Sequence, residues 1–97
     1  MARGPKLLED MRRSKSGWGE SDFFSILEYY GYELERQARH GSFYRHPLLA
    51  SHPDIEVRRN RAQIVIPKGR QLREYVAEKV VASIDTLLAY QKELDNG

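Results

Sequence analysis

A chain of 97 residues without cysteine forms one small domain, which packing must stabilise because no disulfide bond or thiolate metal site is available. The formal net charge is only +2, but residues 36–73 hold nine lysines and arginines against two acidic residues. No stretch approaches the roughly 20 apolar residues of a membrane span, and the N-terminal sequence lacks the apolar run of a secretory signal, so we expect a cytoplasmic protein.

The first predicted element is a short helical arm within residues 1–18. Its sequence PKLLEDMRR suits a helix with Pro5 near the start, and KSGWG interrupts that helix. The arm either folds back on the core or binds a neighbouring molecule. Residues 19–97 are expected to form the core of this single domain.

The segment GESDFFSILEYYGY predicts the first core helix. Ser21 is expected as its N-cap, Asp22 suits its first turn, and Gly31 ends it. Its apolar residues recur at helical spacing at Phe23, Ile26, Leu27 and Tyr30.

From Tyr32 the apolar period changes to two, so YELERQAR and SFYRHPLL predict two antiparallel strands joined by a turn near His40 and Gly41. The polar segment ASHPDIEVRRNR is expected to be a long connection. AQIVIPKG then predicts a third strand, with Ile64 and Ile66 on one face and Pro67 at its end.

A long amphipathic helix is predicted from Leu72 to Leu94, because apolar residues recur there every three or four positions. The order of elements is therefore helix, three strands, helix. It predicts an α+β fold of the α-β-β-β-α kind, in which two main helices cover one face of a three-stranded antiparallel sheet and leave the other face open.

The basic middle of the chain, combined with an open sheet face, favours a polyanion such as RNA. The best candidate phosphate site is where the third strand leads into the last helix. Lys68, Arg70 and Arg73 lie there, and the backbone N–H groups at the start of that helix also favour phosphate.

The predicted hairpin carries the candidate catalytic chemistry. A histidine such as His40 can exchange protons with RNA near neutral pH, and Arg36, Arg39 and Arg45 can stabilise charge on the phosphate. Ser42 is a candidate for a hydrogen bond to phosphate or within the turn.

Phe43 and Tyr44 have opposite strand parity, so one of them enters the core and the other lies on the sheet face. An exposed Tyr44 can stack on a base; alternatively both rings pack against the rest of the domain. His52, in the connection, is a candidate RNA or partner contact, although a solvent-exposed loop residue is the simpler explanation. The histidines lack metal-ligand spacing, so no metal or other cofactor is expected.

The chain also resembles the HicA family of small bacterial mRNA interferases, from KLLEDMRR to the last helix. The matching pieces are KLLEDMRR followed by a tryptophan, DFFSILEYYGYEL, ERQ, FYRHP, IVIPKG and REYVAEKVVASIDTL. The resemblance implies a double-stranded-RNA-binding-like fold, cleavage of mRNA, and neutralisation by a HicB-like antitoxin.

The Gly-Ser-His stretch of that family, whose histidine serves in RNA cleavage, falls on Arg39, His40 and Gly41 when ERQ and YRHP are aligned without a gap. His40 is thus displaced by one residue from the family position. A histidine also occurs in the matched FYRHP piece, and we rank this residue, His46, second for catalysis.

Three functions follow from these observations. The first is a HicA-like endoribonuclease that needs no metal. The second is an RNA-binding module of the same fold without cleavage activity. The third is a protein-interaction domain whose basic patch binds an acidic partner.

Overall fold

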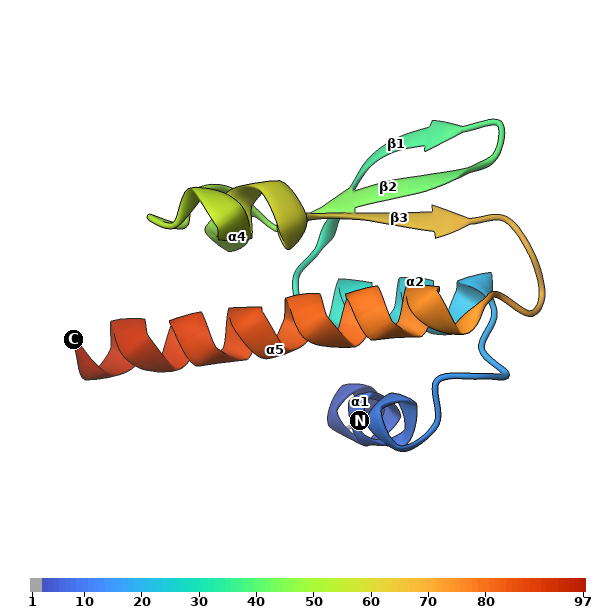
Figure 1. Ribbon diagram of the computed structural model, residues 1–97, viewed down its shortest axis with the longest axis horizontal. Coiled ribbons are helices and arrows are strands. Elements are labelled where there is room, and N and C mark those ends of the chain that lie inside the picture. Colours follow the sequence, from blue (N-terminus) through green and yellow to red (C-terminus); the bar gives the residue numbers. More distant parts are fainter. Residues whose placement is uncertain (1–2) are drawn as a thin grey trace.

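The computed structural model describes residues 3–97, which form a helical layer packed beneath a small sheet, with one further helix below (Figure 1). The elements in chain order are α1 (Arg3–Arg13), α2 (Glu20–Tyr29), β1 (Glu33–Ala38), β2 (Gly41–Arg45), α3 (Pro47–Ala50), α4 (Ile55–Asn60), β3 (Gln63–Pro67) and α5 (Glu74–Asn96). None of the helices within these residues is long and apolar enough to cross a membrane.

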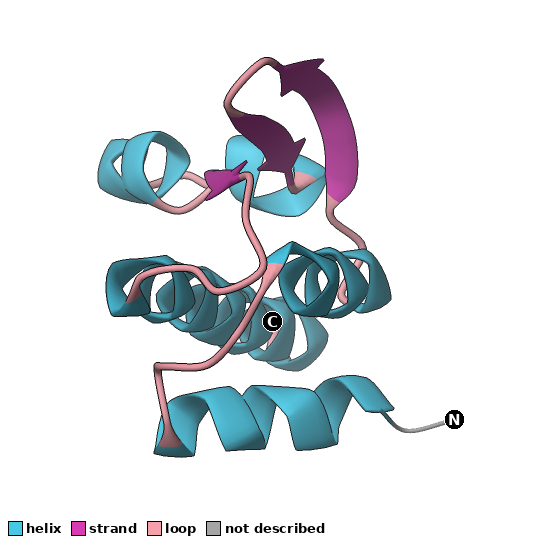
Figure 2. Cartoon of the chain, turned by 90° about the vertical axis from the view of Figure 1, so that its right-hand side faces the viewer, coloured by secondary structure: helices cyan, strands magenta, loops and turns pink. Residues whose placement is uncertain are grey.

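The sheet has the order β1-β2-β3, and both neighbouring pairs are antiparallel. Helices α2 and α5 lie side by side against one of its faces, as Figures 1 and 2 show from two directions. The predicted α+β fold, with a three-stranded antiparallel sheet and helices on one side, is therefore confirmed. No described helix lies over the opposite side of the sheet. We call that side the open face.

The core lies between the sheet and the two helices beneath it. From the sheet, Tyr44, Ile64 and Ile66 are buried. The helices contribute a larger apolar set, comprising Phe23, Ile26 and Leu27 from α2 and Val76, Ala77, Val80, Val81, Ile84 and Leu87 from α5. The three-to-four spacing of these α5 residues puts them on one stripe, which is why the helix packs along its length.

Helix α1 folds back on the core, on the side of α2 and α5 that is turned away from the sheet (Figure 1). Leu8 and Met11 are buried there, and Arg12 forms an ion pair with Asp85 of α5. The arm thus closes the underside of the helical layer and leaves the open face uncovered.

The structure corrects three details of the sequence prediction. The N-cap of α2 is Gly19 rather than Ser21, and the Gly19 N–H donates to the Asp22 carboxylate at 2.9 Å. Strand β2 ends at Arg45, because the next residue caps helix α3. The polar connection contains helix α4, whose N-cap Asp54 accepts from the Glu56 N–H. Short helices held by caps carry too few turns for a periodic apolar signal.

Candidate nucleic-acid interface

Alternation along β2 and β3 decides which side chains reach the open face. Ser42 and Tyr44 point to the core, whereas Phe43 and Arg45 point outward. In the register with β3, Phe43 is opposite Val65, whose side chain is 47% exposed. An aromatic and an aliphatic side chain therefore form an apolar centre on the open face.

An irregularity in β1 places an arginine beside that centre. The register with β2 shifts between Leu34 and Arg36, so Leu34 is opposite Tyr44 and Arg36 is opposite Phe43. Such a bulge sends residues two apart in sequence to opposite faces. The Arg36 guanidinium carbon lies 4.2 Å from the centroid of the Phe43 ring, in a cation–π arrangement.

The open face is not uniformly positive, because β1 also contributes carboxylates. Glu33 is opposite Arg45 in the register, and Glu35 accepts a hydrogen bond of 2.8 Å from the Gln63 side-chain amide. Charges of both signs therefore surround the apolar centre. These two acids precede the basic segment 36–73 in the sequence, and their position beside its arginines follows from strand pairing and the bulge, which no local pattern shows.

The positive charge is concentrated instead at one end of the sheet. The turn between β1 and β2 consists of Arg39 and His40, and the His40 carbonyl accepts a hydrogen bond of 3.2 Å from the Lys68 N–H. This bond joins the hairpin turn to the loop between β3 and α5. We call the exposed residues of this turn, of that loop and of the start of α5 the basic end; they are Arg39, His40, Lys68, Arg70 and Arg73.

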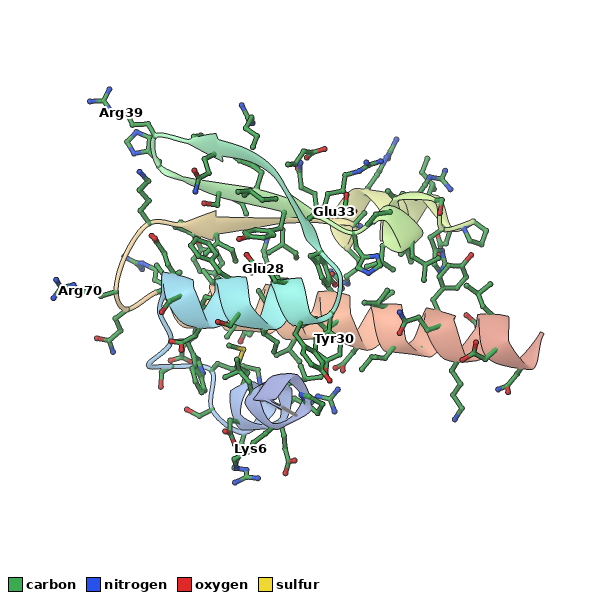
Figure 3. The ribbon with its side chains drawn as sticks, turned by 180° about the vertical axis from the view of Figure 1, so that it is seen from behind. Lys6, Glu28, Tyr30, Glu33, Arg39 and Arg70 are labelled. Atoms are coloured by element: carbon green, nitrogen blue, oxygen red, sulfur yellow. The ribbon has the colours of Figure 1, made fainter. Side chains whose placement is uncertain are left out.

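Figure 3 shows Arg39 and Arg70 extending into solvent at this same end of the molecule. In Figure 2 the hairpin turn and the loop that precedes α5 face the viewer together. The predicted phosphate site therefore lies next to the predicted catalytic turn, although the two are almost 30 residues apart in sequence.

Contacts to the start of α2 fix the loop that carries Lys68 and Arg70. The Gly69 N–H donates to the Glu20 carboxylate at 3.1 Å, and the Glu20 N–H donates to the Gly69 carbonyl at 3.2 Å. The backbone also approaches closely here, since a Cβ atom at Gly19 would lie 2.3 Å from the Arg70 carbonyl oxygen. These contacts hold the basic loop in place, while the carboxylate of Glu20 offsets part of its charge.

His40 is exposed in the hairpin turn, and no hydrogen bond to its imidazole occurs within residues 3–97. Both ring nitrogens are therefore accessible from solvent. The next position, where the resemblance places the family histidine, cannot take a side chain without a shift. A Cβ atom at Gly41 would lie 2.8 Å from the Ile66 carbonyl oxygen of the adjacent strand.

His46 is not available for proton transfer to RNA, which corrects the second catalytic candidate. Its side chain is only 8% exposed. Nδ1 accepts from the Leu48 N–H at 3.1 Å, so Nε2 carries the proton and donates to the Tyr30 carbonyl at 3.0 Å. Burial lowers the pKa of His46 below its ordinary value of 6.5. The ring is a neutral structural group that caps α3.

Two predicted RNA contacts are also wrong. Tyr44 is 2% exposed, its ring packs on Phe24, and its hydroxyl donates to the Glu28 carboxylate at 3.3 Å. Burial and that carboxylate raise the pKa of Tyr44 to about 12. Ser42, at 4% exposure, also points to the core. Of the adjacent aromatic pair, Phe43 is the residue on the open face.

A second group of arginines lies on α4, at the opposite end of the sheet from the hairpin turn (Figure 1). Arg58 is directed to its own chain, because it donates to the carbonyl of His52 at 2.6 Å and to that of Pro53 at 3.1 Å. The His52 ring packs against Tyr90 of α5, with ring centroids 4.2 Å apart. This region is therefore separate from the basic end.

Comparison of the chain with family models, with curated proteins and with solved structures gives no match. The functional assignment consequently depends on the chemistry of the site and on the sequence resemblance.

Proposed function

We propose that the chain binds RNA through the basic end and, like the HicA toxins it resembles, cleaves mRNA without a metal ion. The observation that supports this most directly is the backbone hydrogen bond between Lys68 and His40. It holds a solvent-accessible imidazole beside a loop that supplies two cations, and phosphate contacts by such groups supply essentially all of the sequence-independent affinity for nucleic acid.

The proposed reaction uses His40 as the general base. The imidazole accepts the proton of a ribose 2′-hydroxyl, whose oxygen attacks the adjacent phosphorus. The bond from phosphorus to the 5′-oxygen breaks, and that oxygen takes a proton from water. The imidazolium then gives its proton to the hydroxide that remains, which regenerates the base. The products are a 2′,3′-cyclic phosphate and a 5′-hydroxyl end. Arg39, Lys68 and Arg70 stabilise the additional negative charge of the phosphorane.

The resemblance to HicA toxins also suggests a substrate and a protein partner. It supports mRNA in the cytoplasm as the substrate and a HicB-like protein as the antitoxin. An antitoxin that neutralises the toxin by blocking the basic end would need acidic groups opposite Arg39 and Arg70.

A second candidate is an RNA-binding module that does not cleave. One observation favours it: in the described chain, no carboxylate or other side chain forms a hydrogen bond that orients the His40 ring. A general base acts efficiently when its ring is held in a productive orientation. RNA itself would have to supply that orientation here.

The test is incubation of the purified protein with single-stranded RNA in EDTA. We expect fragments ending in a cyclic phosphate, and a loss of cleavage rate of about 100-fold or more in His40→Ala. The matched control is His52→Asn, which changes a histidine at the other end of the sheet and should cleave like the wild type. Thermal unfolding of both variants verifies that each is folded.

The alternative outcomes separate the candidates. RNA that stays intact but binds with strong salt dependence identifies the non-cleaving module. If RNA does not bind even at low salt, where phosphate contacts are strongest, both RNA functions are wrong and the basic end docks an acidic protein instead.

A further inference from the structure

The centre of the open face carries an arginine guanidinium above an aromatic ring. The Arg36 guanidinium lies over the Phe43 ring at 4.2 Å, and Arg36 is exposed. Within residues 3–97 no hydrogen bond or ion pair engages this guanidinium. It therefore presents its outer surface to solvent while the ring beneath restricts its orientation. Such a plane can stack on a nucleobase.

The charges around this pair disfavour phosphate at the same place. Glu33 and Glu35 lie on the open face with Arg36 and Arg45, so the carboxylates balance the guanidinium groups. A phosphate that approaches the centre of the face encounters both signs, whereas the basic end offers mainly cations. The open face is thus better suited to the uncharged part of a nucleotide, and the basic end to its phosphate.

We propose that the Arg36–Phe43 pair is a stacking platform for an unpaired nucleobase, and that the chain therefore selects single-stranded over duplex RNA. This inference rests on the RNA binding proposed above. In a duplex the faces of the bases are hidden within the stack and the phosphates lie outside, so the platform has nothing to contact. In a single strand each base exposes a face.

The spacing along β2 makes the two contacts compatible. Phe43 lies two residues beyond Gly41, where β2 leaves the hairpin turn, which corresponds to about 7 Å along the strand. A short stretch of RNA can therefore place a phosphate at the basic end and a base on the platform. Because every base has a π-face, we expect this contact to discriminate weakly among the four bases.

The experiment measures fluorescence anisotropy of the wild-type protein with a labelled 2′-O-methyl decaribonucleotide, which lacks the 2′-hydroxyl needed for cleavage. The same strand annealed to its complement is the duplex probe. We expect the single strand to bind at least about 10-fold more tightly, and Phe43→Leu to weaken its binding about 5- to 150-fold. The matched control Val65→Ala removes apolar area from the same face without removing a π-face and should change affinity less than about twofold.

Two further measurements identify the contact as base stacking. Arg36→Lys keeps the positive charge and loses the planar group, and we expect it to weaken binding of the single strand. This exposed substitution also tests the platform if Phe43→Leu fails to fold. A probe with abasic sites should bind the wild type and Phe43→Leu equally, because removal of the base already eliminates the contact.

The failures of the two proposals are distinguishable. If single strand and duplex bind equally and neither Phe43→Leu nor Arg36→Lys weakens binding, the platform is wrong while RNA binding at the basic end stands. If Val65→Ala weakens binding as much as Phe43→Leu, the face makes a general apolar contact, which also overturns base stacking. If neither probe binds at low salt, the proposed function fails with it.

Discussion

At the scale of single residues, the three histidines have the same side chain, and their surroundings decide what each can do. His46 uses both ring nitrogens inside the fold, and His52 packs on Tyr90 while its Nδ1 accepts from the Asp54 N–H. His40 lies in a turn with its ring open to solvent. Proton exchange with a ligand needs an accessible nitrogen, so His40 is the histidine suited to acid–base chemistry.

The buried histidine predicts a pH dependence of stability. Because the pKa of His46 is lower in the folded chain than its ordinary value of 6.5, the unfolded chain binds more protons just below that pH. The free energy of unfolding therefore falls as pH decreases from about 6.5 toward the folded pKa, and this contribution is fully present above about 6.5. Urea unfolding between pH 5 and 7.5 measures this decrease.

The variant His46→Asn tests this assignment, since asparagine can accept from the Leu48 N–H but does not titrate. We expect the decrease toward pH 5 to become smaller. At pH 7.5 the variant should lose about 1 kcal/mol, because the part-buried Tyr30 carbonyl loses its donor. The control His40→Asn should keep the wild-type pH dependence. An unchanged decrease in His46→Asn would show that another group causes it.

At the scale of elements, the N-cap of α2 is not the residue that the sequence pattern predicted. Ser21 is a typical capping residue, but the N-cap is Gly19, two residues earlier, and the Asp22 carboxylate accepts from the Gly19 N–H. We predict that Asp22→Ala lowers the free energy of unfolding by about 1 kcal/mol. Ser21→Ala should change it by less than about 0.5 kcal/mol. Chemical denaturation of the two variants measures both values, and equal losses would restore Ser21 as the cap.

The elements that the sequence predicted well are those whose burial follows a regular period. Ile64 and Ile66 lie two residues apart on the buried face of β3, and the apolar stripe of α5 continues for several turns. The bounds of β3 and of α5 were therefore predicted closely. Helices α3 and α4 were missed because caps at His46 and Asp54 define them. The bulge in β1 was missed because it depends on how the strand pairs, which no local pattern encodes.

The candidate site was predictable only in part, for the same reason. Charge along the chain identified the basic residues of the turn and loop, and alternation showed that Phe43 and Tyr44 face opposite sides. It did not show which of the two is buried. That choice depends on the packing of Tyr44 against Phe24 and on its hydrogen bond to Glu28, residues that are distant in sequence.

At the scale of the whole molecule, the layered arrangement separates two surfaces. Helix α1 closes the underside, where Lys6 extends away from the sheet (Figure 3), and the basic end lies at the edge where the hairpin turn meets the start of α5. The net charge of +2 is too small to attract RNA to every surface. Binding by the basic end should therefore depend on the position of a charge and not only on the total charge.

The salt dependence of RNA affinity tests this directly. For a single strand, the slope of log K against log salt decreases in magnitude by about 0.7 for each phosphate contact that is lost. We predict that Lys68→Gln combined with Arg70→Gln reduces the magnitude of the slope by roughly 1.4, because both side chains extend from the basic loop. The matched control is Lys6→Gln combined with Lys92→Gln, which removes the same charge from α1 and from the C-terminal part of α5. Anisotropy titrations from about 50 to 200 mM salt should give the wild-type slope for this control. Equal changes in the two double variants would mean that RNA responds to net charge alone, and the basic end would then have no special role.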